Sequence, residues 1–94
     1  MNKIILYLLM LSISWAKLIN PPNNSNISYI HVLFEWEDIP GTMLYELQIS
    51  KTENFNEVIQ TINTNKIFYL EKEVLQWNSD YYWKVRSENG EWME

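Results

Sequence analysis

Apolar and polar side chains alternate at every second position in three segments of the chain. The alternation is clearest in Tyr45-Glu46-Leu47-Gln48-Ile49 and in Tyr81-Tyr82-Trp83-Lys84-Val85, and it recurs over 32–36, where we expect the outer side to be mostly polar. Side chains of a β-strand point to opposite faces in turn, so a period of two is typical of strands that bury one face. We therefore assign the following residues to a shared core or its corner: Phe34, Trp36, Tyr45, Leu47, Ile49, Leu75, Tyr81, Trp83 and Val85.

Turn-forming residues separate the strand segments. Pro40-Gly41 favours a tight turn that ends the strand before it, and Asn89-Gly90 is the preferred pair for a two-residue hairpin loop, which a short last strand should follow. Residues 58–62 and 67–70 have the length and composition of two further strands, with 58–62 at a sheet edge. Because no helix longer than a turn or two fits the pattern, the sequence predicts an all-β antiparallel sandwich of about seven strands.

The first sixteen residues form a separate segment. A basic start precedes an almost unbroken apolar run from Ile4 to Ile13, and small residues then occupy the two positions that a signal peptidase reads. We expect a signal peptide over residues 1–16, cleaved after Ala16, and one domain over residues 17–94. A membrane anchor is the alternative, but a span needs about 20 apolar residues and this run is shorter. The protein is therefore expected to be secreted, periplasmic or at the cell surface, without stable membrane insertion after cleavage.

Composition narrows the classes of function. Of the 94 residues, 78 follow the cleavage point, which makes one small domain, and the chain has no cysteine. Packed aromatic and aliphatic side chains must then stabilise the domain, because disulfides cannot. Loss of Lys3 with the leader leaves six Lys and Arg against twelve Asp and Glu, a net charge of −6. Nucleic acids and anionic membranes bind to clustered Lys and Arg, so the acidic balance argues against both as partners.

The chain lacks the residue sets that catalysis or cofactor binding needs. His31 is the only histidine, and without cysteine there is neither a thiol nucleophile nor a set of nitrogen and sulfur metal ligands. Glu35, Glu37 and Asp38 suggest a calcium site, but they lack its ligand spacing, so a solvated acidic loop is the better interpretation. The two glycines are too far apart for a phosphate loop. We expect no catalytic residue, no cofactor and no metal.

Aromatic side chains outside the predicted core are the candidates for ligand contact. Tyr82 faces outward by alternation, while Trp77 lies in the predicted corner and Trp92 in the last strand. Exposed rings can stack on sugars or pack on a partner protein, although covering the sheet is the more frequent role. Asn23 and Asn26 each begin a glycosylation sequon, which matters only in a host that glycosylates proteins.

The order of these features resembles a fibronectin type III domain, in the form found in secreted and cell-surface proteins of bacteria. The resemblance covers nearly all of residues 18–94 and depends on a Pro-rich entry segment, Phe34-Glu35-Trp36, Pro40-Gly41, Tyr45 to Ser50, Leu75 and Tyr81 to Arg86. It implies an immunoglobulin-like sandwich in which a tyrosine, here Tyr81, folds its hydroxyl back onto upstream backbone. The last strand, 91–94, is shorter than in the family. We therefore expect the chain to be the N-terminal part of a longer protein.

Two functions follow from this resemblance. The first is a non-catalytic module that spaces or displays other domains of a secreted or cell-surface protein, or that binds proteins through its loops and sheet faces. The second is an accessory domain, in contact with polysaccharide, that precedes a secreted polysaccharide-degrading enzyme. A free-standing secreted binder is a third alternative, and it requires the short last strand to be complete. The expected partners are accordingly other domains, other proteins or a polysaccharide.

Overall fold

The described part of the chain is all-β. The computed structural model describes residues 16–28 and 30–93, so the expected signal peptide lies outside it apart from Ala16. These residues contain no helix, and hence none that is long and apolar enough to cross a membrane. The strands are β1 (Leu18–Asn20), β2 (Val32–Trp36), β3 (Tyr45–Ser50), β4 (Val58–Thr64), β5 (Phe68–Glu71) and β6 (Tyr82–Ser87).

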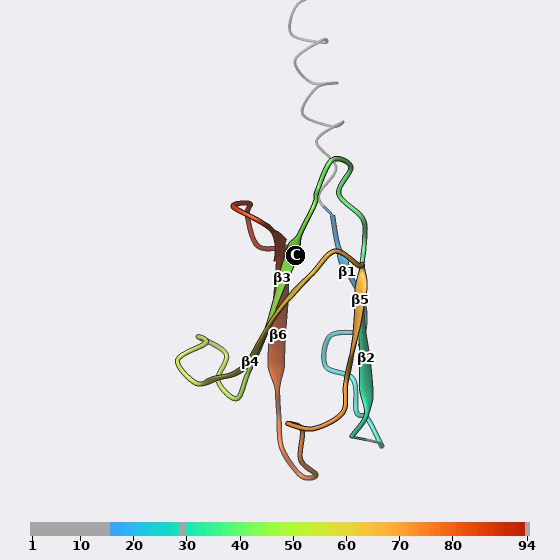
Figure 1. The fold of residues 1–94 in the computed structure, drawn as a ribbon. Coiled ribbons are helices and arrows are strands. Elements are labelled where there is room, and N and C mark those ends of the chain that lie inside the picture. Colours follow the sequence, from blue (N-terminus) through green and yellow to red (C-terminus); the bar gives the residue numbers. More distant parts are fainter. Residues whose placement is uncertain (1–15, 29, 94) are drawn as a thin grey trace, which may run out of the picture.

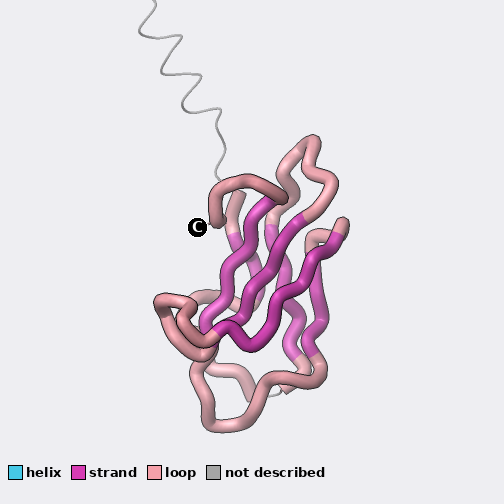
Figure 2. The backbone as a smooth tube through the Cα atoms, turned by 60° about the vertical axis from the view of Figure 1, so that its left-hand side comes forward, coloured by secondary structure: helices cyan, strands magenta, loops and turns pink. Residues whose placement is uncertain are grey.

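The strands form two antiparallel sheets that face each other, as Figures 1 and 2 show. Sheet A has the order β1-β2-β5, and sheet B has the order β4-β3-β6. β2 and β3 follow each other in the chain yet belong to different sheets, so the segment between them crosses from one layer to the other. The predicted sandwich is confirmed at this level, and β4 lies at a sheet edge as expected.

The crossing segment contains the turn predicted at Pro40-Gly41. The Thr42 N–H donates to the Ile39 carbonyl at 3.1 Å, which closes a four-residue turn. Gly41 has a φ of 85°, and a positive φ at the third residue of such a turn favours glycine. The turn ends one layer and starts the other, so it does not form a hairpin within one sheet.

The predicted hairpin loop after β6 is displaced by one residue. The Gly90 N–H donates to the Ser87 carbonyl at 2.9 Å, which places Glu88 and Asn89 at the centre of the turn instead of Asn89 and Gly90. Asn89 takes the positive φ of 61°. A Cβ at Gly90 would collide with the Ser87 side chain, so glycine permits close approach there. A tight turn thus lies where it was predicted, but Asn89 is its second central residue and Gly90 closes it.

The core lies between the two sheets. Seven of the nine residues assigned to it are buried: Phe34, Trp36, Tyr45, Leu47, Ile49, Leu75 and Val85. Trp83 and Tyr81 are only partly buried and pack against this cluster. Trp83 still contacts Phe34 of the opposite sheet edge to face, with ring centroids 5.0 Å apart. β6 is an edge strand of the described sheet B, so Trp83 has a strand neighbour, β3, on one side only.

The strand register explains why alternation was informative in sheet B. β3 pairs with β6 so that Leu47 is opposite Val85 and Ile49 is opposite Trp83. Directly opposite residues share a face, and this face points to the core. Glu46 is opposite Arg86 on the other face, where both side chains reach water. The sequence pattern therefore identified both faces of this sheet.

The corner before β6 has the predicted tyrosine contact. The Gln76 N–H donates to the Tyr81 hydroxyl at 2.9 Å, so the hydroxyl binds backbone five residues upstream. Asn78 lies in the intervening turn with a φ of 59°, a conformation that asparagine tolerates better than most residues. The contact fixes the path of the chain from Leu75 in the core to β6.

Two features at the chain ends differ from expectation. β1 lies at the start of the entry segment, where we predicted no strand, and its Leu18 is opposite Trp36 of β2. After the last turn, the described residues form a single bridge between Arg86 and Trp92 instead of a strand. The Met93 N–H donates to the Val85 carbonyl at 2.7 Å and extends this bridge. The described fold thus has six strands and one bridge.

The outer face of sheet A is more apolar than expected, because apolar residues of β5 accompany Leu33 and Glu35 on it. Leu33 lies on this face of β2, and Phe68 and Leu70 lie on the same face of β5. Alternation could not reveal it, because Ile67-Phe68-Tyr69-Leu70 is an unbroken apolar run in which either phase could face the core. Which residues of this run lie on the outer face therefore becomes known only from the strand register.

Candidate functional site

The structure separates the three residues predicted to contact a ligand. Trp77 lies in the turn before β6 and is 56% exposed, whereas Tyr82 begins β6 and is 38% exposed. Trp92 is half-buried and bridges to Arg86. Four residues of strand separate Tyr82 from Arg86, a distance of about 13 Å at roughly 3.3 Å per residue. Tyr82 and Trp92 therefore do not form one stacking surface.

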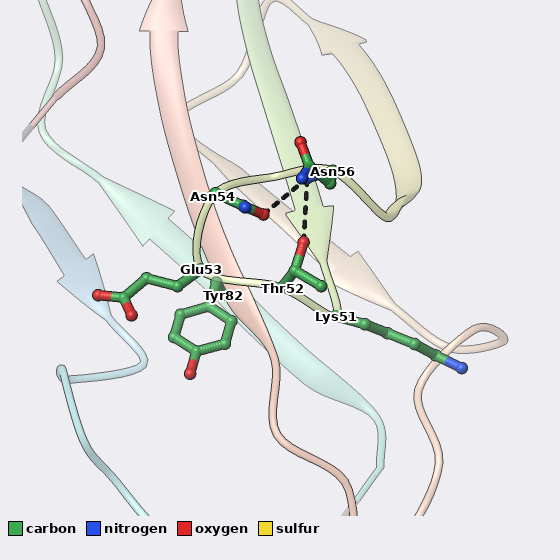
Figure 3. A pocket seen from close by; sticks show the side chains of 6 residues that line it. All are labelled: Lys51, Thr52, Glu53, Asn54, Asn56 and Tyr82. Atoms are coloured by element: carbon green, nitrogen blue, oxygen red, sulfur yellow. Dashed lines mark hydrogen bonds between the residues drawn. The ribbon is translucent and has the colours of Figure 1, made fainter.

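A shallow hollow lies beside Tyr82, where the β3–β4 loop passes the start of β6 (Figure 3). Apart from Tyr82, its lining is polar and comes entirely from this loop. One aromatic ring surrounded by amide and hydroxyl groups can stack on a sugar and hydrogen-bond its hydroxyls. The lining residues are Lys51, Thr52, Glu53, Asn54, Asn56 and Tyr82. The sequence indicated the ring, but not the loop that accompanies it.

Hydrogen bonds within the β3–β4 loop hold this hollow in shape. Ser50 is fully buried, and its hydroxyl accepts from the Thr52 N–H and donates to the Glu57 carbonyl, each at 3.0 Å. The Thr52 hydroxyl accepts from the N–H groups of Asn56 at 3.0 Å and Glu57 at 3.1 Å. The Asn54 side-chain oxygen accepts from the Asn56 N–H as well, at 3.2 Å. Short hydroxyl and amide side chains commonly organise loops in this way.

The outer face of sheet B carries a row of cation–π contacts. The Lys84 ammonium lies 4.1 Å from the ring centroid of Phe55 and 4.2 Å from that of Trp92. The Arg86 guanidinium lies 4.4 Å from the Trp92 centroid, and its Nε donates to Glu46 at 2.7 Å. Trp92 thus packs on two cations of the same protein, which favours the covering role over ligand stacking.

The acidic residues weighed as a calcium site do not converge. Within residues 16–28 and 30–93, no group of three or more His, Asp or Glu side chains is placed to hold a metal ion. Glu35 lies on β2, whereas Glu37 accepts from the Lys17 N–H at 2.8 Å and so helps to fasten the entry segment. Asp38 accepts from the Tyr45 hydroxyl at the edge of the core, and His31 is exposed. Glu37 and Asp38 thus hold different segments in place.

Tyr45 connects the acidic loop to the core. Its hydroxyl donates to Asp38 Oδ1 and accepts from the Ile39 N–H, both at 2.7 Å. Burial raises the pKa of Tyr45; the Ile39 N–H partly opposes this, and Asp38 adds to it. The phenol therefore stays protonated and serves as a fixed donor.

Glu71 is the polar centre that sequence reasoning missed. Its side chain is on the core side of β5 and only 1% exposed. Oε2 accepts from the N–H groups of Glu73 at 2.8 Å and Val74 at 3.1 Å, and Oε1 accepts from the Gln60 amide at 3.1 Å and the Tyr69 hydroxyl at 3.3 Å. Glu71 lies two residues after the inward Tyr69, and strand residues two apart share a face, but the apolar run 67–70 gave no sign of which phase faces the core.

These four hydrogen bonds keep the buried carboxyl ionised. Burial by itself raises the pKa of Glu71, but the backbone N–H groups of Glu73 and Val74, with the Gln60 and Tyr69 side chains, lower it further than burial raises it. The net pKa lies below the ordinary value of 4.5. Tyr69 responds in the opposite sense, since burial and the neighbouring negative charge raise its pKa. The carboxylate is a structural acceptor whose lone pairs are already used.

Comparisons of the chain with protein-family models, with curated proteins and with solved structures found no match. The described residues offer a polar hollow with one exposed tyrosine, a row of cation–π contacts, a hydrogen-bonded buried carboxylate and one apolar sheet face. Of these features, the hollow and the apolar face are exposed to a partner.

Proposed function

We propose that the chain is a non-catalytic interaction or spacer module of a secreted or cell-surface protein, built as a fibronectin type III-like domain. The strand order supports this proposal. Immunoglobulin-like sandwiches place their first, second and fifth strands in one sheet and their third and sixth in the other. β1, β2 and β5 form sheet A, and β3 and β6 adjoin in sheet B. The bond from the Gln76 N–H to the Tyr81 hydroxyl also matches the tyrosine corner of such folds.

The bonding of the acidic side chains supports a non-catalytic role. A general acid or base must reach the substrate and exchange a proton with it. Glu71 is buried and holds four donors, Asp38 accepts from Tyr45, and Glu46 accepts from Arg86. These three carboxylates hold the fold together, which supports surface contact as the role of the domain.

Export is part of the proposal. Residues 1–16 are proposed as the signal peptide on the sequence pattern described above, with Ala16 as the last residue removed. Expression of the chain with a C-terminal epitope in an exporting host tests this. A product in the medium or periplasm whose N-terminus is Lys17 is expected. Retention of the full-length chain in the cytoplasm would contradict it.

Contact with polysaccharide, as the accessory domain of a polysaccharide-degrading enzyme, is the second candidate function. The hollow beside Tyr82 favours it, because an exposed ring and the polar side chains of the β3–β4 loop line the same hollow. Trp92 does not contribute, since its ring packs on Lys84 and Arg86. The two functions therefore differ in whether Tyr82 binds sugar.

Electrophoresis in gels that contain soluble neutral or acidic polysaccharides separates the two functions. The chain is compared with Tyr82→Ala, and with Trp77→Ala as a matched exposed aromatic outside the hollow. Retardation that Tyr82→Ala abolishes and Trp77→Ala retains would establish sugar binding. Equal migration of all three with and without polysaccharide would remove that candidate and leave the protein-contact module. Release of reducing ends from any of these polysaccharides by the purified chain would contradict the non-catalytic assignment itself.

A further inference from the structure

The outer face of sheet A carries four apolar side chains, which come from all three of its strands. On this sheet A face each of the four is more than a third exposed: Ile19 54%, Leu33 37%, Phe68 46% and Leu70 41%. Leu33 is directly opposite Leu70 in the register of β2 and β5, so their side chains adjoin. Single exposed apolar residues are ordinary, but a contiguous group on a flat sheet marks a contact surface.

The opposite side of the sandwich shows that this composition is not general to the domain. On the outer face of sheet B, Glu46, Gln48, Lys84 and Arg86 occupy the equivalent outward positions of β3 and β6. Trp92 and Phe55 cover part of that face by packing on its cations. The described residues supply no such cover for the sheet A face.

Two opposite charges lie within the sheet A face. Glu35 is outward on β2, directly opposite Phe68, and the Lys66 ammonium lies 5.6 Å from the centroid of the Phe68 ring. Neither group has an ion-pair partner among the described residues. The ion pair that these residues form joins Arg86 to Glu46, on the other sheet. The face is therefore locally neutral on a chain whose net charge is −5. Two acidic copies repel each other least where they approach through such a surface.

We propose that the sheet A face binds the same face of a second copy of this chain. The register makes the surface self-complementary. A two-fold axis parallel to the strands, between β2 and β5, places Leu33 of one copy on Leu70 of the other and Phe68 of one copy over Glu35 of the other. Lys66, which reaches along its own Phe68, then meets Glu35 of the second copy. The ion pair forms twice in each dimer, because the axis repeats every contact.

The size of the face limits the strength of the association. The axis places β2 and β5 of one copy on β5 and β2 of the other, so two strands about 4.8 Å apart, each presenting about five residues at roughly 3.3 Å, give a surface of about 10 by 17 Å. Stable interfaces bury about 800 Å² on each partner, so this dimer belongs to the weak class. We expect a dissociation constant of roughly 0.1 to 1 mM, a range that matters when copies are concentrated at a surface. The inference is independent of whether Tyr82 binds sugar.

Sedimentation of the purified chain from about 20 μM to 1 mM tests the proposal, with mass spectrometry recording whether residues 1–16 are retained. Glu35→Lys and Lys66→Glu each turn the attraction across the axis into repulsion at two places, so each variant alone is expected to dimerise at least tenfold more weakly. An equimolar mixture of the two restores association, because every cross-copy pair is then attractive. Glu53→Lys and Lys51→Glu, in the β3–β4 loop, make the same charge changes outside the face and should dimerise as the parent does.

Leu70→Ser probes the apolar contact separately and should also weaken the dimer, while circular dichroism confirms that each variant is folded. A parent chain that stays monomeric at 1 mM would overturn the proposal. So would single charge variants that still dimerise, or a mixture that stays monomeric. If the chain associates only when residues 1–16 are retained, then that apolar segment causes the association, either by binding the sheet A face or by binding to its own copy. This result would also overturn the contact between folded copies.

Discussion

The side-chain amide of Gln60 donates to Glu71 Oε1 at 3.1 Å and joins the two sheets of the sandwich. Gln60 belongs to β4 in sheet B, and Glu71 belongs to β5 in sheet A. The same carboxylate receives the backbone N–H groups of Glu73 and Val74, which follow β5. A single buried charge thus connects both layers and the start of the next loop.

We expect Glu71→Gln to lower the free energy of unfolding by about 1–3 kcal/mol, because a neutral amide cannot replace a carboxylate that receives four donors. In this variant the side-chain NH₂ group would face two of the donors, and those donors would lose their acceptor. Urea unfolding followed by circular dichroism measures the change. Glu57→Gln, an exposed glutamate of the β3–β4 loop, is the matched control and should unfold like the parent. Equal loss in both variants would show that Glu71 has no special role.

The pH dependence of stability should reflect the same carboxylate. The folded state lowers the pKa of Glu71 below 4.5, so Glu71 binds its proton more weakly in the folded than in the unfolded chain. Its contribution is therefore complete above the unfolded pKa and is lost as the pH falls from about 4.5 through the folded pKa. Unfolding free energies of the parent and Glu71→Gln, measured between pH 7 and pH 3, should converge at the acid end. A constant difference across this range would contradict the ionised assignment.

Trp36 is the largest fully buried side chain of the core, and its ring packs against Tyr45 with centroids 5.9 Å apart. Trp36→Ala should cost about 3–5 kcal/mol, because it leaves a large cavity between the sheets. The Nε1 of Trp36 is buried without a hydrogen-bond partner in the described structure. Trp36→Phe removes that unpaired donor along with part of the ring, so it should cost clearly less than the alanine variant. Thermal unfolding of the three proteins decides this, and equal costs for the two variants would mean that the cavity does not dominate.

Tyr81 and Tyr82 offer a matched pair for testing the corner contact. Tyr81→Phe removes the acceptor of the Gln76 N–H and should cost about 1 kcal/mol, which shifts the midpoint of thermal unfolding by roughly 4–8 °C in a domain of this size. Tyr82→Phe removes a hydroxyl that makes no hydrogen bond among the described residues and should leave the midpoint within about 1–2 °C of the parent. A larger effect at Tyr82 than at Tyr81 would contradict the corner.

The sequence predicted sheet B better than sheet A, and the reason is the pattern that each contains. Tyr45, Leu47 and Ile49 alternate with polar residues, so only one phase could face the core, and the structure has that phase. Residues 67–70 are apolar at every position and specify no phase, so the exposure of Phe68 and Leu70 emerged only from the register.

The candidate sites were predicted in part, for a related reason. The outward position of Tyr82 followed from alternation, but the hollow beside it is formed by a loop about thirty residues upstream, which local patterns do not place. Glu71 was missed because its donors come from β4, from its own strand and from the following loop. A buried charge is recognisable only when these segments are assembled.

The passage of the chain between layers after β2 has a consequence for biogenesis. β2 pairs with β5, which lies more than thirty residues later in the chain, and β3 is separated from its partner β6 by a similar length. Each central strand therefore needs a distant segment to pair along its second edge. Contacts of such long range form slowly, because the entropy of closing the intervening segment is lost before they form. A nascent chain is therefore expected to complete neither sheet until Val85 is available.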